Sequence, residues 1–364
     1  MPQLLKKIKI AFWAVTPNGA KLIDKLSRDL PEADSYVSRN LAVKKSSYIL
    51  FERLSVTLED KFHQYAGHVF IMSTGIVVRV IAPLIQNKTK DPAVVVVDDL
   101  GKNAISLLSG HIGGANEMAR KIARIIGANP VITTATDINE VPAIDVLAMQ
   151  KNLVIENPGA IKTVNMALLK GEKICIHDPF DFLKNSLPNS ESTTFLDLKY
   201  SINKRAQNLV LNHNTCVLID DVTVDLPSQV LILRPLTLVA GIGCNRDTDR
   251  EEINAHLKKV LESHRLAPTS LKCIASIDVK ADEAGLIALS KSLNLPLVFF
   301  KPEELNPVKG IQNPSLVVEK HVGVKSVCEA AAILAARGGT LIVPKQSTKN
   351  VTVAIARINF SSSE

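Results

Sequence analysis

The feature that most constrains the fold is a continuous apolar run, Ala93–Val97, which is followed by a glycine-rich turn and then by a helical pattern. The run is β-branched and does not alternate with polar residues, which is typical of a strand buried on both faces of a parallel sheet. The turn, residues 109–116, reads Ser-Gly-His-Ile-Gly-Gly-Ala-Asn. From Ala115 to Ile126 apolar residues recur at helical spacing, so the sequence predicts an amphipathic helix whose N-terminus carries the turn.

The same succession of strand, small polar turn and helix recurs through the N-terminal third. Further strands are expected at residues 8–15, 68–72 and 131–132, and further helices after the turns at 16–19 and 73–75. Alternation of this kind predicts a parallel sheet with helices on both faces, in three layers.

A second α/β unit is predicted from about Leu236. Its first apolar run, Leu238–Ala240, leads into a Gly-Ile-Gly-Cys segment that we expect to form a turn before a helix. Two capping boxes are predicted to start helices in this unit, one formed by Thr248 with Glu251 and one by Ser326 with Glu329.

The predicted fold class is therefore α/β, with two three-layer α/β/α domains at the two ends of the chain. The domains are residues 1–137 and 236–364, and residues 138–235 form a smaller irregular middle region with some β structure. A chain of 364 residues exceeds one typical core, so two or three domains are expected.

Composition limits the classes of function. The apolar runs are too short to span a membrane, and the first of them resembles a strand more than a signal peptide, so a cytoplasmic protein is predicted. Five scattered cysteines without a CxxC pair disfavour a disulfide framework or a cysteine-based metal site. The net charge of +7 favours an anionic partner. With 4% aromatic residues and no dense basic run, a small polycarboxylate or phosphate ligand fits at least as well as nucleic acid.

The turn 109–116 predicts an anion site. Helix starts expose unsatisfied N–H groups, glycines let a ligand approach the backbone, and ligands of open α/β sheets collect at the carboxyl ends of strands. His111 lies within the turn. A tight turn with hydroxyl caps and a surface histidine is the alternative.

Three other patterns carry less weight. Gly241-x-Gly243 before a helix is similar to part of a dinucleotide fingerprint, but the third glycine and the acidic residue are missing. Cys244 is either an activated thiol or, as we expect, a small buried residue in a turn. No spacing of His, Glu or Cys indicates a protein-bound metal.

Several segments in this order resemble the CbiG family, the cobalt-precorrin-5A hydrolases of anaerobic cobalamin (vitamin B12) biosynthesis. They are the segments 73–79, 91–98, 107–116 and 131–137 in the first half, and 241–244, 276–283, 323–331 and Lys345 in the second. The resemblance covers most of residues 1–178 and 236–358.

The resemblance implies a hydrolase that opens the δ-lactone of a cobalt corrinoid, cobalt-precorrin-5A, and releases acetaldehyde to give cobalt-precorrin-5B. It implies no cofactor, because cobalt arrives within the substrate. The implied partners are the small-molecule corrinoid and, transiently, neighbouring pathway methyltransferases, with neither nucleic acid nor membrane. The oligomeric state is left open, with a homodimer as one option.

We expect His111 to be the base that activates water. Beside a helix N-terminus its protonated form is disfavoured, which would keep it neutral. Glu117 and Asp137 are alternative bases or orienting partners, and the N–H groups of Gly113, Gly114 and Ala115 are candidate oxyanion donors. The predicted substrate-binding residues are Ser73, Thr74, Gly75, Arg79, Lys88, Ser109, Gly110, Gly113, Gly114, Asn116, Thr133, Thr134, Thr136, Gly241, Gly243, Cys244 and Lys280.

Two spatial expectations accompany these roles. The turns at 73–75, 109–116 and 133–136 should gather at one edge of the first sheet, and the macrocycle should lie in a cleft between the N- and C-terminal domains. The alternative functions are a non-catalytic tetrapyrrole carrier or scaffold and, more weakly supported, a nucleotide-binding oxidoreductase.

Overall fold

The structure is a computed structural model that describes residues 9–41, 45–87, 90–111, 113–139, 141–187, 193–196, 215–314 and 323–359. The chain divides into two compact units, residues 3–146 and residues 147–364. The boundaries at 137 and 235 that the sequence indicated stay predictions.

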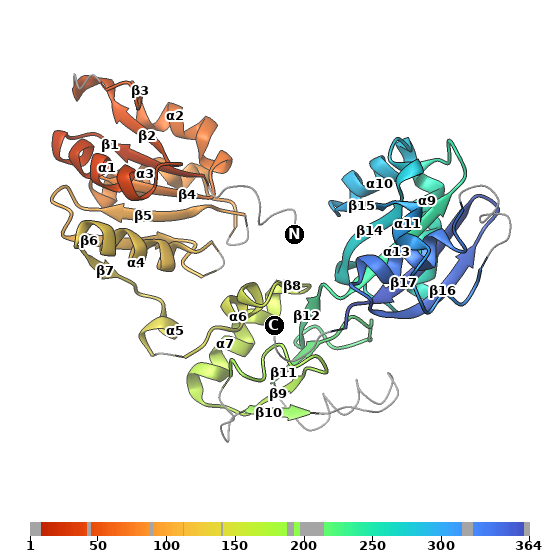
Figure 1. The fold of residues 1–364 in the computed structure, drawn as a ribbon. Coiled ribbons are helices and arrows are strands. Elements are labelled where there is room, and N and C mark those ends of the chain that lie inside the picture. The colour runs from red at the N-terminus through yellow and green to blue at the C-terminus, as the bar shows by residue number, and fades with distance from the viewer. Residues whose placement is uncertain are drawn as a thin grey trace. The chain divides into compact units, whose positions relative to one another are not determined.

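The first unit is built on a seven-stranded sheet of order β3-β2-β1-β4-β5-β6-β7 (Figure 1). Its strands are β1 (Ile10–Ala14), β2 (Asp34–Ser38), β3 (Tyr48–Phe51), β4 (Gly67–Ile71), β5 (Ala93–Val97), β6 (Asn103–Leu108) and β7 (Asn129–Val131). Its helices are α1 (Pro17–Asp29), α2 (Leu54–Lys61), α3 (Thr74–Ile81), α4 (Ala115–Ile126) and α5 (Ala135–Ile138), with single turns η1 (Arg39–Leu41), η2 (Phe62–Gln64) and η3 (Ala82–Leu84). Helix α6 (Ile144–Gln150) spans the division between the units.

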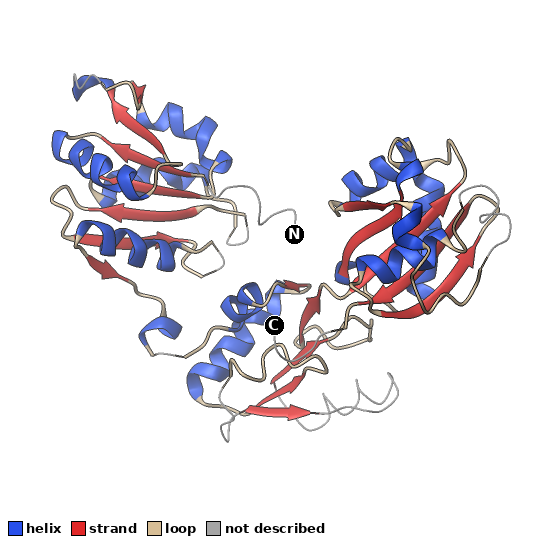
Figure 2. Ribbon diagram, viewed as in Figure 1, coloured by secondary structure: helices blue, strands red, loops and turns tan. Residues whose placement is uncertain are grey.

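Alternating side chains of the central strands build two cores, one on each face of this sheet. Phe12 and Val95 face α1 and α4, whereas Trp13 and Val96 face α2 and α3. Helices therefore cover both faces, as Figure 2 shows, and the three-layer prediction is confirmed. The predicted buried strand at Ala93–Val97 is present as β5.

The sheet is not wholly parallel. Strand β6, which the sequence did not indicate, pairs antiparallel with β5, and β7 then pairs parallel with β6. Strands β6 and β7 consequently run opposite to β1, β4 and β5. The prediction of a parallel sheet throughout is wrong at this point.

The second unit holds two five-stranded sheets. The middle sheet, of order β10-β9-β11-β12-β8, carries more regular structure than the sequence indicated. Its elements are β8 (Leu153–Ile155), η4 (Pro158–Ala160), α7 (Ile161–Lys170), β9 (Ile174–His177), β10 (Thr193–Leu196), β11 (Thr215–Ile219) and β12 (Leu231–Pro235). The sequence predicted an irregular middle region with some β structure, and its residues 197–214 lie outside the described residues.

The C-terminal sheet has the order β15-β14-β13-β17-β16, with helices packed on both faces. Its strands are β13 (Leu238–Cys244), β14 (Leu271–Ile277), β15 (Leu297–Phe300), β16 (Thr340–Ser347) and β17 (Val351–Arg357). Its helices are α9 (Arg250–Ser263), α10 (Ala284–Leu293), α11 (Pro302–Leu305) and α13 (Val327–Ala335), with single turns η5 (Pro268–Ser270) and η6 (Asp278–Lys280).

Three local predictions are corrected. The turn expected at 16–19 is the start of α1, because Thr16 caps the helix and Pro17 is its first residue. The Gly-Ile-Gly-Cys segment is the end of strand β13, paired with β17 through Cys244. Neither capping box forms: Asp249 caps α9, and Ser326 makes no side-chain capping bond to α13.

Asp221 connects the two sheets of this unit. It is fully buried, and its carboxylate accepts hydrogen bonds from Thr237 at 2.6 Å and from both Nε and Nη2 of Arg357 at 2.7 Å. Among the described residues no helix is long and apolar enough to cross a membrane.

Candidate functional site

The glycine-rich turn connects the end of β6 to α4 and is closed by its own backbone. Ala115 N–H donates to the Ser109 carbonyl, and Gly114 N–H donates to the His111 carbonyl. These two N–H groups already donate to carbonyls of the turn, which disfavours them as oxyanion donors, and all three predicted donors, Gly113 included, stay predictions. Gly113 must be glycine, because a Cβ there would lie 2.3 Å from the Ser109 Cβ. Gly114 has φ 83°, a left-handed conformation that favours glycine.

His111 lies between two carboxylates. Its Nε2 is 3.1 Å from Asp137 Oδ2, and its Nδ1 is 3.6 Å from Asp145 Oδ2. The side chain is 17% exposed. Asp145 raises the pKa of His111 most strongly, burial opposes the shift, and Asp137 adds to the increase. The net shift is upward, so the expectation that the helix N-terminus keeps His111 neutral is wrong: the two carboxylates favour the imidazolium.

Asp137 is fixed as a carboxylate by three side chains. Besides His111, it accepts a hydrogen bond from Asn116 Nδ2 at 2.8 Å and one from Arg120 Nη2 at 2.5 Å. Burial raises its pKa, but the hydrogen bonds and charges of Arg120 and His111 outweigh burial and hold the pKa below the usual value. A carboxylate with this many donors is a weak base, so its geometry favours the orienting role among the two that the sequence allowed.

Asn116 ties the turn to the neighbouring segments. Its amide donates to Thr134 Oγ1 at 3.0 Å, and its Oδ1 accepts from Ser106 on β6 at 2.6 Å. The amide fits tightly against the turn, since a Cβ at Gly110 would lie 2.7 Å from Asn116 Oδ1. Asn116, Thr134 and Asp137 were predicted from the sequence and are brought together here.

Other predicted residues of this segment are less central. Glu117 is 75% exposed and faces Arg120 at 3.7 Å. Ser109 donates to the Asp91 carbonyl. Thr133 is exposed, the side chain of Thr136 lies outside the described residues, and so does Lys88.

The expectation that all three turns share one edge of the sheet is wrong. Strand β6 is antiparallel to β5, so Leu108 lies opposite Val94 near the beginning of β5, whereas Ser73 follows the end of β4 beside Val97. Five strand residues separate these edges, about 17 Å at ~3.4 Å per residue. The predicted binding residues around the start of α3 therefore lie at the sheet edge opposite His111; they are Ser73, Thr74, Gly75 and Arg79. There, Arg79 donates a hydrogen bond to the Gly75 carbonyl within its own helix.

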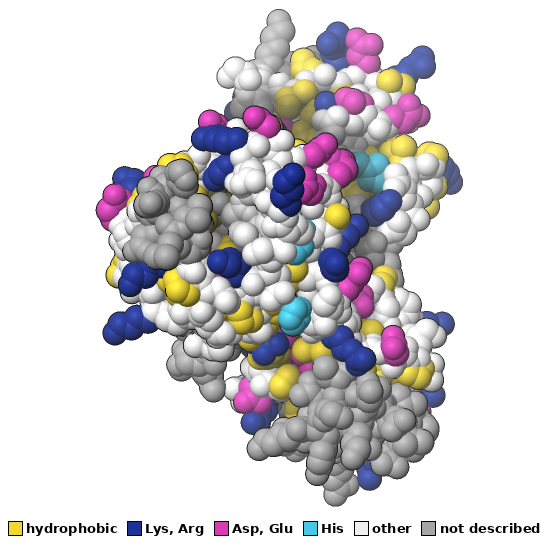
Figure 3. Space-filling view, turned by 90° about the vertical axis from the view of Figure 1, so that its right-hand side faces the viewer, with side chains coloured by type: hydrophobic (Ala, Val, Ile, Leu, Met, Phe, Trp, Pro, Cys, Tyr) yellow, Lys and Arg dark blue, Asp and Glu magenta, His cyan; other side chains and the backbone are white. Residues whose placement is uncertain are grey.

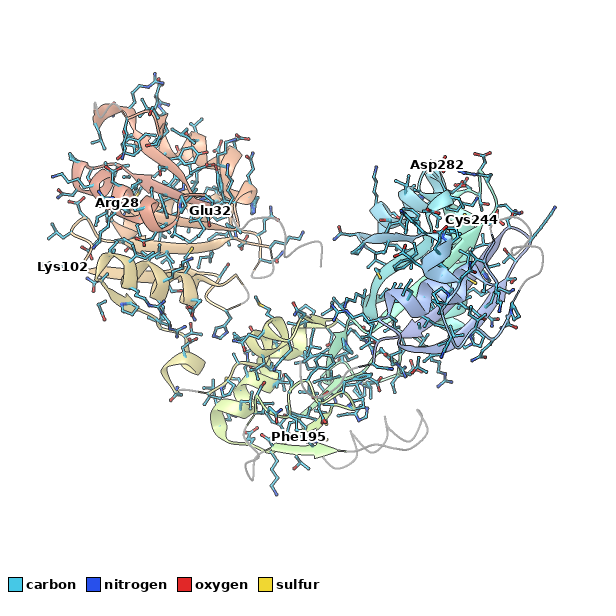
Figure 4. The ribbon with its side chains drawn as sticks, in the orientation of Figure 1. Arg28, Glu32, Lys102, Phe195, Cys244 and Asp282 are labelled. Carbon is cyan, nitrogen blue, oxygen red and sulfur yellow. The ribbon has the colours of Figure 1, made fainter. Side chains whose placement is uncertain are left out.

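The residues predicted in the second unit divide differently. Gly243, Cys244 and Lys280 line a cavity of about 440 Å³ in the C-terminal domain. Gly241 instead permits close packing of α13, because a Cβ there would lie 1.9 Å from the Cys328 carbonyl oxygen. Cys244, labelled in Figure 4, is no activated thiol, since burial raises its pKa to about 11.

Sequence reasoning missed Asp145, Arg120 and Ser106. Arg120 lies one turn after Asn116 on α4, so helical spacing could have placed it beside Asp137. Asp145 lies in the first turn of α6, a later segment, and no feature of the sequence around it predicts contact with His111. Across the described residues, no group of three or more His, Cys, Asp or Glu side chains is arranged to hold a metal ion.

Three family models match the chain: Cobalamin synthesis G N-terminal over residues 56–137, Cobalamin biosynthesis central region over 142–235, and Cobalamin synthesis G C-terminus over 238–356. Two similar proteins bear the name cobalt-precorrin-5A hydrolase. The one from Salmonella typhimurium is 37% identical over 93% of this chain and 94% of its own. The one from Priestia megaterium is 31% identical over 96% of this chain and 95% of its own. A solved cobalamin biosynthesis protein G homolog from Sulfolobus solfataricus is 25% identical, covers 96% of this chain and 97% of its own, and has a TM-score of 0.37.

Proposed function

This chain belongs to the CbiG family of cobalamin biosynthesis proteins, and on that premise we propose that it is a cobalt-precorrin-5A hydrolase of the anaerobic cobalamin pathway. The family resemblance inferred from the sequence is confirmed. The relatives that bear this name match over more than nine-tenths of both chains, so the proposal concerns the whole chain rather than one domain. The substrate is a small-molecule corrinoid, and its cobalt enters as part of it.

The proposed reaction has two bond-breaking steps. Water adds to the acyl carbon of the lactone and the acyl C–O bond breaks, which leaves a carboxylic acid on the macrocycle and a hydroxyl on the carbon that will depart. That hydroxyl loses its proton, the C–C bond to the macrocycle breaks, and the electron pair left on the macrocycle takes up a proton. The products are acetaldehyde and cobalt-precorrin-5B.

The observation that carries a catalytic role is the position of His111 between two carboxylates, at 3.1 and 3.6 Å. An imidazolium held in this way is a general acid near neutral pH. We assign His111 to donate the proton of Nδ1, which faces Asp145 at the longer distance of 3.6 Å, to the departing lactone oxygen. As a neutral imidazole it can then remove the hydroxyl proton before the C–C bond breaks. Asp137 and Asp145 are positioning residues that fix the ring and favour its charged form.

Acetaldehyde release from the lactone-bearing cobalt corrinoid tests this proposal. The His111→Ala variant should lose about a hundred-fold or more of kcat, which is the usual contribution of a general acid–base group. The matched control is His63→Ala, an exposed histidine of the same unit whose Nε2 bonds the Leu84 carbonyl. The control should keep the wild-type rate. Full activity of His111→Ala would exclude the assigned role.

The carrier hypothesis makes a different prediction in the same assay. A non-catalytic tetrapyrrole carrier would bind the corrinoid and release no acetaldehyde above the uncatalysed background, even as wild-type protein. Transient contact with neighbouring methyltransferases and a homodimer also stay proposals. Pull-down with those enzymes and sedimentation of the purified chain would test them.

A further inference from the structure

The cavity of the C-terminal domain lies where the ends of several strands of its sheet meet. It opens between the last residues of β13 and β14, the turn that joins β16 to β17, and the beginning of α13. Its volume of about 440 Å³ falls within the range of small-molecule sites. All its lining residues belong to residues 243–352, so it is distinct in the chain from the His111 constellation.

The charge of the cavity is one-sided. Lys280, Lys345 and Lys349 line it, and no Asp or Glu is among its lining residues, all of which are described. On the molecular face in Figure 3, by contrast, Lys and Arg side chains lie among Asp and Glu side chains. A cluster of ammonium groups without lining carboxylates attracts anions and raises their local concentration.

The three lysines are held in different ways. Lys280 forms an ion pair with the buried Glu283 at 3.1 Å, which offsets much of its charge. Lys345 Nζ donates to a neutral group, the Asn313 carbonyl, at 3.1 Å. Lys349 lies in the exposed turn between β16 and β17. Lys345 and Lys349 are therefore the main sources of attraction for an anion.

A buried carboxylate sets the position of Lys345. Glu329, fully buried on α13, accepts the Lys345 N–H at 2.8 Å and the Gln312 N–H at 2.7 Å. It also accepts two hydrogen bonds from Asn313, whose carbonyl holds the Lys345 ammonium. This network fixes the lysine backbone at the cavity wall. The same wall includes Ser326, the residue that precedes α13, so the positive end of a nine-residue helix points to the same side.

We propose that this cavity binds the carboxylate groups at the rim of a tetrapyrrole, with Lys345 and Lys349 as the binding residues. The inference rests on the proposed function, which supplies a substrate and product that carry acetate and propionate side chains. A corrinoid is larger than the cavity, so only an edge of the macrocycle enters it. The site would thus contribute affinity for substrate or product, and no reacting group is assigned to it.

The binding test uses uroporphyrin, a fluorescent tetrapyrrole whose rim carries only acetate and propionate groups and which has no lactone. Fluorescence anisotropy of uroporphyrin is titrated with the full chain and with the Lys345→Ala/Lys349→Ala variant. Loss of both ammonium groups should weaken binding about ten-fold or more. Binding should also weaken as salt is added, and the fully esterified porphyrin should not bind.

The matched control is Lys258→Ala/Lys259→Ala, which removes two exposed lysines of α9 in the same domain, outside the cavity. The control should bind uroporphyrin as the wild type does. The single variant Lys349→Ala is also tested, because a substitution in an exposed turn should leave folding intact. Thermal unfolding compares the stability of each variant with that of the wild type. Undiminished binding by both cavity variants would overturn the proposal, and so would pyrophosphate binding without uroporphyrin binding.

Turnover separates this inference from the proposed function. With the lactone substrate, the cavity variants should raise KM about ten-fold while kcat stays near the wild-type value. If the wild type binds uroporphyrin through these lysines but releases no acetaldehyde, the binding proposal for the cavity is supported and the hydrolase proposal fails. If acetaldehyde release is normal and the lysines affect neither KM nor porphyrin binding, the cavity proposal alone fails.

Discussion

Replacing Asp145 by Asn removes the carboxylate that most raises the pKa of His111. Its Oδ2 lies 3.6 Å from His111 Nδ1, and the His111 side chain is 17% exposed. An opposite charge at such a distance favours the charged form of the imidazole, and solvent screens this attraction only in part because both side chains are largely buried. The Asp145→Asn variant should therefore lower the His111 pKa, because the imidazolium loses its main stabilising charge while Asp137 remains.

The shift can be followed by NMR titration of the full chain with ¹³C-labelled histidine, in which the His111 resonance is identified by its loss in His111→Asn. The pH profile of acetaldehyde release provides a second readout. If protonated His111 is the acid, activity declines as pH rises past its pKa, and in Asp145→Asn that decline should begin at a lower pH than in the wild type. A His111 pKa that stays the same or rises in the variant would refute the reasoning from these two carboxylates.

Three further predictions concern stability, each measured by urea unfolding of the full chain. Burial lowers the pKa of His68 to about 4, whereas a histidine in the unfolded chain titrates near 6.5, so the unfolded state binds this proton first as pH falls. The free energy of unfolding should therefore drop by about 2 kcal/mol between pH 7 and pH 5 because of His68. This contribution to the pH dependence should vanish in His68→Gln. Gly241→Ala places a Cβ 1.9 Å from the backbone of α13 and should lower the free energy of unfolding by about 3 kcal/mol. In the control, Gly159→Ala, the new Cβ has no heavy atom within 4 Å, so the free energy of unfolding should hardly change. Equal effects of the two substitutions would contradict the packing argument. Asp221→Asn leaves the charge of Arg357 without its carboxylate and should cost about 2 to 3 kcal/mol, and an unchanged midpoint would show that this ion pair contributes nothing.

The elements that the sequence predicted well are those with one dominant local pattern. The run Ala93–Val97 is a buried strand, and the helix from Ala115 to Ile126 has the boundaries that its periodicity indicated. Both elements depend on side chains that face a core, and such burial produces a recognisable pattern of apolar residues in the sequence. The prediction of a turn at Gly241–Cys244 failed because Gly241 allows α13 to pack closely against β13, and local turn preferences do not reveal such packing.

The candidate site was predicted only in part because its assembly depends on strand direction. Ser106 and Leu108 belong to a half-buried strand whose pattern is ambiguous, and its antiparallel pairing moves the turn 109–116 to the edge away from Ser73. The grouping of His111 with Asp137 follows from the parallel pairing of β6 and β7, which brings their carboxyl ends together. Asp145 comes from a later helix, and only the folded chain places it at His111.

The catalytic role of His111 is tested by a single-turnover experiment with enzyme in excess over the lactone-bearing corrinoid, run with wild-type protein and with His111→Asn. Both proteins should bind the corrinoid, and only the wild type should open the lactone and release acetaldehyde at a substantial rate. Acetaldehyde formed at the wild-type rate by His111→Asn would contradict the account and place the acid–base chemistry on other residues.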